Sequence, residues 1–230
     1  ASGGVARFST VGLSGPVGSY TLTFGASGFA SATQSVALTA GVATQLALTT
    51  SAAGAASGAA FTTQPVVAIR DGVGNTVTSD NSSIVTMTVS AGGTVVGTAT
   101  STASGGVARF STVGIAGTAG TSYTLTFAKT GLIPATQSIT PTFGTASQVF
   151  LTTNAAGAAS GAAFTTQPGV AIRDGAGNTV TSDNSSIVTV TVSTGGSVVG
   201  TATATASGGV ARFSTVGLSG PVGSYTLTFG

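Results

Sequence analysis

The sequence predicts an all-β protein built from tandem β-sandwich domains, and three observations lead to this prediction. A long pattern repeats, because the segment Phe61–Pro65 returns as Phe164–Pro168, 103 residues further on. Short alternations of apolar and polar residues recur about every 8–12 residues between Gly, Asn, Asp and Pro, a spacing typical of sandwiches. Glycine and β-branched residues disfavour helix along the whole chain.

The strands and turns of one repeat can be read in order from alternation and turn chemistry. Alternation with β-branched and aromatic residues indicates half-buried strands, and Gly, Asp and Asn indicate turns. The predicted strands are Val66–Arg70, Ile84–Val89, Thr94–Thr102, Gly106–Phe110, Tyr123–Phe127 and Thr136–Thr142, and the predicted turns are Asp71–Asn75 and Thr78–Ser83.

The sequence also has a second, longer period. Residues Ala1–Gly25 are identical to Ala206–Gly230, so two copies form a superrepeat of 205 residues. We therefore expect a window from a longer tandem array, with the end of one domain at 1–45, a complete domain at 46–147, and a domain lacking its last strand at 148–230. The Ala/Gly-rich stretches Ser51–Ala60 and Asn154–Ala163 are expected to be the softest segments.

The composition argues against most chemistry. Charged residues make up 4% of the chain, the net charge is +2, and there is no His, Cys or Trp. All four acidic residues are Asp, which leaves little for acid–base catalysis, nucleophilic triads or the usual metal ligand sets. Basic residues do not cluster, so nucleic acid is not an expected partner, and no apolar run approaches the ~18 residues of a membrane span.

The order of motifs resembles the bacterial immunoglobulin-like domains of invasin-type adhesins and large surface proteins. The resemblance rests on Phe-Thr-Thr-Gln-Pro, Val-Ala-Ile-Arg-Asp-Gly, Gly-Gly-Val-Ala-Arg-Phe-Ser-Thr and Ser-Tyr-Thr-Leu-Thr-Phe, and it covers essentially the whole chain. It implies tandem Ig-like sandwiches, with Tyr123 in the place of a tyrosine-corner residue and Leu125 in the place of the antibody cysteine. The antibody disulfide and tryptophan are absent, so apolar packing alone must stabilise the core.

Several residues are candidates for functional sites, and each also has a purely structural interpretation. Asp71 with Asp80 could be read as a calcium site, but a turn is favoured because calcium needs six to eight oxygens. Arg70 and its neighbour Asp71 are interpreted as an ion pair at the rim of the domain and not as a functional site. Asn81 and Asn184 fit the N-glycosylation pattern, but turn chemistry is the favoured interpretation of both.

Two further patterns lie on the predicted surface. Arg7, Arg109 and Arg212 occupy one position in three copies and are candidates for an inter-chain contact, against a merely solubilising role. The outward threonine pairs could order water or bind ice, against the ordinary role of Thr on a neutral sheet; they are Thr86/Thr88, Thr124/Thr126 and Thr98/Thr100.

Together these features predict a non-enzymatic structural protein without a cofactor. We expect an extracellular or cell-surface stalk, fibre or sheath of near-identical Ig-like repeats whose main partner is another copy of itself, with the cell envelope or glycans as further partners. The alternative is an adhesin module that binds carbohydrate or a surface receptor. Ice binding through the threonine array is a third hypothesis.

Overall fold

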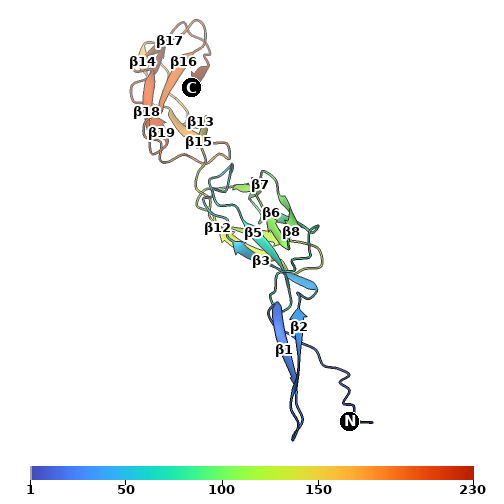
Figure 1. Cartoon of the computed structure of the whole chain (residues 1–230). Helices are drawn as coiled ribbons and strands as arrows, with labels where there is room; N and C mark the ends of the chain where they lie inside the picture. Colours follow the sequence, from blue (N-terminus) through green and yellow to red (C-terminus); the bar gives the residue numbers. More distant parts are fainter. Residues whose placement is uncertain (1) are drawn as a thin grey trace.

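Every regular element in the computed structural model, which describes residues 2–230, is a β-strand, and this confirms the all-β prediction. The strands form three successive units that follow one another along the molecule (Figure 1). We call residues 2–42 the first unit, 43–145 the complete unit and 146–230 the third unit. No helix within the described range could span a membrane.

The complete unit is a sandwich with immunoglobulin-type strand order. Its main sheet runs β12-β11-β6-β8-β9-β5-β3, and β4-β10-β7 form a small additional sheet. One layer contains β3, β5, β9 and β8, the other contains β6, β11 and β12, and β8 pairs with both β9 and β6 at the edge. These layers correspond to the ABED and CFG sheets of constant-type Ig domains. The strands are β3 (Ala43–Thr50), β4 (Ala59–Ala60), β5 (Val66–Asp71), β6 (Ile84–Val89), β7 (Thr94–Val96), β8 (Thr100–Ser104), β9 (Val107–Arg109), β10 (Gly114–Ala116), β11 (Tyr123–Ala128) and β12 (Ala135–Ile139).

The third unit repeats this architecture up to its last described strand. Its main sheet runs β13-β15-β19-β18-β16-β21, and even the register irregularities of β3 recur in β13. The first unit contributes one hairpin, β1 (Gly18–Phe24) with β2 (Ala32–Leu38), which corresponds to β11 and β12. The strands of the third unit are β13 (Ala146–Thr153), β14 (Ala162–Ala163), β15 (Gly169–Asp174), β16 (Ile187–Val192), β17 (Ser197–Val199), β18 (Thr203–Ser207), β19 (Val210–Arg212), β20 (Gly217–Ser219) and β21 (Leu227–Phe229).

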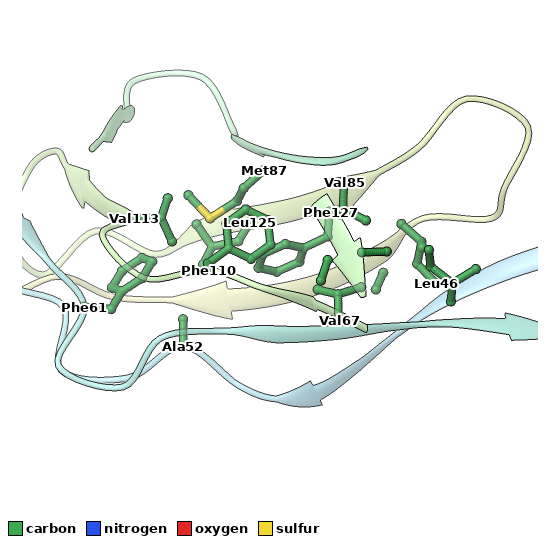
Figure 2. Close-up of a cluster of buried hydrophobic side chains, with 14 of the residues drawn as sticks. Leu46, Ala52, Phe61, Val67, Val85, Met87, Phe110, Val113, Leu125 and Phe127 are labelled. Atoms are coloured by element: carbon green, nitrogen blue, oxygen red, sulfur yellow. The ribbon is translucent and has the colours of Figure 1, made fainter. Parts of the chain in front are cut away.

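The core of the complete unit lies between the two layers and is built from alternating strand positions. In β11, Tyr123, Leu125 and Phe127 are buried while Thr124 faces solvent, as a half-buried strand requires. Figure 2 shows Phe127 and its neighbours filling the space between the layers. The rings of Phe110 and Phe127 meet edge to face with centroids 5.6 Å apart, a favourable aromatic geometry.

A tyrosine corner lies at the start of β11. The Thr118 N–H donates a hydrogen bond of 2.9 Å to the Tyr123 hydroxyl, which ties the strand to the chain five residues upstream. Tyr20 and Tyr225 make the related contact in the other units, where each hydroxyl donates to a proline carbonyl four residues earlier. The three tyrosines therefore serve the fold.

Two details of the predicted elements are wrong. Thr94–Thr102 is not one strand but two, β7 and β8, because the chain turns at Gly97. This glycine has a φ of +74°, and a Cβ there would lie 2.0 Å from the Thr112 carbonyl oxygen. The expected strand Thr136–Thr142 ends earlier, since β12 stops at Ile139 before Pro141.

The Ala/Gly-rich stretch Ser51–Ala60, expected to be soft, packs against the core of the complete unit. Ala52, Ala55 and Ser57 are all buried there. The corresponding stretch 154–163 of the third unit is mostly exposed, and no counterpart of β12 lies beside it in the described residues. The small side chains of this segment thus permit close approach to β12 in the complete unit, and the segment keeps the same local pairing, Ala53 with Thr63 and Ala156 with Thr166, in both units.

Candidate functional site

The two junctions between units are the most distinctive sites of the molecule, and the same turn builds both. In the complete unit the turn is Asp71–Asn75, directly after β5, and in the third unit it is Asp174–Asn178, directly after β15. Each turn lies at the end of its unit that faces the preceding one, so its polar side chains can bind the backbone of that neighbour.

The Asp71 carboxylate first organises its own turn. Its Oδ1 atom accepts hydrogen bonds from the N–H groups of Val73, Gly74 and Asn75, at 2.8–3.0 Å. This is the local Asx chemistry that the sequence predicted for the segment. The Asn75 side chain closes the arrangement by donating to Asp71 Oδ2 at 3.0 Å.

The same two side chains then bind the first unit. Asp71 Oδ2 accepts a hydrogen bond of 2.9 Å from the Gly41 N–H. Asn75 donates to the Gly15 carbonyl at 3.0 Å and accepts from the Val17 N–H at 3.0 Å. We call this set of contacts, made by one Asp and one Asn on three backbone sites, the Asp–Asn clasp.

The second junction repeats the clasp contact for contact. Asp174 Oδ2 accepts from the Gly144 N–H at 2.7 Å, and Asn178 donates to the Gly117 carbonyl and accepts from the Ala119 N–H. The extra residue of this copy follows Ala119 and precedes Ser122, so the insertion leaves the clasp contacts of Gly117 and Ala119 intact.

Close backbone packing accompanies the second clasp. The Ser57 hydroxyl both donates to the Gly117 carbonyl and accepts from the Gly117 N–H, at 2.8 and 3.0 Å. A Cβ at Gly144 would lie only 2.1 Å from the Ser57 carbonyl oxygen. The segment that leaves the complete unit therefore has no room for a side chain at this position.

Neutral donors stabilise the ionised form of both clasp carboxylates. The side-chain amide of Asn75 and then the Gly41 N–H hold the pKa of Asp71 well below its usual value. At Asp174, burial raises the pKa, but hydrogen bonds from Gly144 and Asn178 outweigh it and the net pKa is lowered. Both side chains are nearly inaccessible, with 4% and 1% of their surface exposed.

These lowered pKa values predict that the junctions loosen only in strong acid. A carboxyl whose folded pKa is depressed contributes its full stability above the unfolded pKa of about 3.9, and loses it as the pH falls through the folded pKa. The inter-unit geometry, measured by small-angle scattering, should therefore stay constant from neutral pH down to about pH 4 and change below it. Loosening that begins already in mildly acidic buffer would contradict this assignment.

The Asp71 turn is thus a hydrogen-bonded junction, and Asp80 lies in a separate turn. Asp80 accepts from Ser82 and Ser83, while Asp71 accepts from its own turn and the neighbouring unit. Among the described residues no group of three potential metal-ligating acidic side chains comes together. The expected pair of Arg70 with Asp71 is not among the contacts of that carboxylate, whose partners are all neutral.

The two sequon asparagines have structural partners. The Asn81 side-chain oxygen accepts from the Gly105 N–H at 2.7 Å, and its amide nitrogen donates to the Ser79 carbonyl. Asn184 makes the equivalent contacts with Gly208 and Ser182. Each asparagine thereby joins the Asp80-type turn to the hairpin that follows β8 or β18.

The arginine and threonine candidates lie on the surface. Arg7, Arg109 and Arg212 are exposed on three different units, and the chain does not bring them together. On the outer face of the complete unit, Thr126 is paired in register with Thr88 on one side and Thr136 on the other. The sheet thus carries a row of threonines across three strands.

Sequence reasoning missed the partners of the clasp because they are backbone atoms of glycines and loop residues. One signal was available: Gly41 precedes Asp71 by 30 residues, and Gly144 precedes Asp174 by the same interval. The glycine and the turn therefore recur together in the repeat, on opposite sides of the boundary between two units.

Comparison with known proteins adds little to this description. No protein-family model matches the chain, and no curated protein matches it in sequence. The solved structures that it matches include a β-glycosidase from Bacteroides vulgatus, with 12% identity and a TM-score of 0.28, and a β-glucuronidase from Parabacteroides merdae, with 11% identity and a TM-score of 0.21. Each alignment covers 80% of this chain and 24% of the enzyme.

Proposed function

We propose that this chain is a non-enzymatic structural protein, an extracellular stalk or fibre in which Ig-like units are held in a fixed orientation. The observation that carries the proposal is the Asp–Asn clasp, which forms with the same contacts at both junctions. A linker that only tethers its domains needs no such contacts, whereas a spacer of defined length and direction does.

The chemistry of the clasp suits this role. Its donors are uncharged amides, so screening by salt affects it less than it affects a surface ion pair. The low surface charge also lowers the repulsion between chains, which favours lateral association of many copies outside the cell.

Small-angle scattering and electron microscopy of the full chain test the proposal. The parent should give a rod of constant length and narrow bending angle, and the double variant Asn75→Ala with Asn178→Ala should bend more widely. A parent chain that already bends freely at both junctions would overturn the spacer function. Sedimentation over a concentration series separately tests self-association, which a strictly monomeric chain would contradict.

An adhesin function has one observation in its favour. A shallow, uncharged groove beside the second clasp is lined by Thr118, Thr140, Phe143, Thr179 and Thr181. Hydroxyl groups around an aromatic ring suit a neutral saccharide. A glycan array with the full chain and its Phe143→Ala variant separates the functions, because a pure spacer gives no binding in either case.

A further inference from the structure

The entry and exit segments of the complete unit lie side by side and point in the same direction. The entry segment, residues 44–57, includes most of β3 and the Ala/Gly-rich stretch after it. The exit segment, residues 133–142, includes β12. Isolated parallel bridges join Gln45 to Ile133 and Ala56 to Thr142, so residue numbers rise together along both segments.

Hydrogen bonds connect the two segments at three levels. At the first level, Leu46 N–H donates to the Ile133 carbonyl at 2.8 Å, and Ile133 N–H donates to the Thr44 carbonyl at 2.9 Å. At the second level, the Gln137 side chain accepts from the Ala52 N–H and donates to the Ala52 carbonyl, at 2.9 and 2.7 Å.

The third level lies next to the following unit. Thr142 N–H donates to the Ala55 carbonyl and Ser57 N–H donates to the Thr142 carbonyl, both at 2.9 Å. On the entry segment Leu46, Ala52, Ala55 and Ser57 are buried, while Ile133 and Thr142 on the exit segment are exposed, so the clamp has one side in the core and one side at the surface. We call this three-level set of contacts the terminal clamp.

We propose that the terminal clamp makes the complete unit a tension-bearing element, in which force along the chain loads all three levels in shear. Tension enters at the start of the entry segment and leaves at the end of the exit segment, which are opposite ends of this parallel pair. The bonds run across the segments, so sliding one segment along the other strains every level together. This function rests on the proposed stalk only in requiring that the chain be pulled from its ends.

Pulling direction provides the direct test, because the parent chain contains no cysteine and handles can be placed at will. Handles at Val42→Cys and Thr145→Cys load the clamp in shear. Handles at Val42→Cys and Thr130→Cys pull on the same end of the parallel pair and open its levels one after another. All three positions are exposed, so the labels should leave the core intact.

In single-molecule force spectroscopy of the full chain at one loading rate, the shear pair should unfold at a severalfold higher force than the opening pair. Unfolding between residues 42 and 145 should release about 350 Å of chain, less the folded distance between the handles, and this identifies the event. Equal forces in the two directions would overturn the proposal, whatever the bending of the junctions, so this result is independent of the spacer test.

Two matched glutamine variants test which hydrogen bonds resist the shear force. Gln137→Ala removes the middle level of the clamp and should lower the shear force. Gln64→Ala removes a similar set of backbone contacts, to Phe61 and Val113, which do not join the terminal segments. It should lower thermal stability but leave the shear force closer to that of the parent. An equal fall in force for both variants would contradict the terminal clamp.

Discussion

Gly144→Ala is expected to destabilise the complete unit by about 3 kcal/mol, the upper range for overpacking a rigid site. The added Cβ would lie 2.1 Å from the Ser57 carbonyl oxygen, which is backbone and cannot rotate away. Relief requires moving the exit segment, which also strains the hydrogen bond from Ser57 to Thr142. Thermal unfolding followed by circular dichroism should show a midpoint lower by about 15 °C for this unit.

The first junction provides a matched control for this substitution. Gly41 occupies the corresponding position, but a Cβ there would meet the Asp71 side chain at ordinary contact distances of 3.6–4.0 Å. Gly41→Ala should therefore leave the unfolding midpoint nearly unchanged. If the two variants lose the same stability, the steric argument is wrong.

Asp174→Ala should loosen the second junction and destabilise the third unit by about 3 kcal/mol, because one buried and three part-buried N–H donors lose a charged acceptor. The donors that lose the carboxylate are the backbone N–H groups of Gly144, Ala176 and Asn178 and the side-chain amide of Asn178. Spin labels on cysteines at the exposed positions Thr124 and Thr191 would report the distance between units. The distribution of this distance should broaden markedly.

Asp183→Ala is the control for this prediction. Asp183 also accepts several hydrogen bonds, from Ser185 and Ser186, but it lies within its own unit and contacts no other. Its loss should lower the stability of the third unit while the distance distribution stays narrow. A broadening equal to that of Asp174→Ala would show that orientation depends on the general stability of the unit and not on the clasp.

Alternation and turn chemistry predicted much of the fold. Tyr123–Phe127 and Ile84–Val89 match β11 and β6 almost residue for residue, because each buries every second side chain. Thr94–Thr102 failed because its alternation continues through Gly97, whose positive φ and contact with Thr112 depend on the tertiary structure. The local alternation of residue types carries no information about this contact between Gly97 and Thr112.

The junctions were only half predictable. Asp71 and Asn75 indicated a turn through their own chemistry, but the partner atoms belong to Gly15, Val17 and Gly41 of the preceding unit. Backbone groups carry no residue-type signature. The close packing of the Ala/Gly-rich stretch Ser51–Ala60 was not predictable for a related reason, since its partner, the exit segment, lies about 85 residues further along the chain.

The clasp also bears on how such a chain can change length over generations. Each joint depends on one aspartate and one asparagine in the following unit and on main-chain atoms in the preceding one, so a joint needs no pair of matched side chains. Recombination that adds or removes whole repeats therefore brings together two ends that already fit. The array can grow or shrink by complete steps without any compensating mutation at the new boundary.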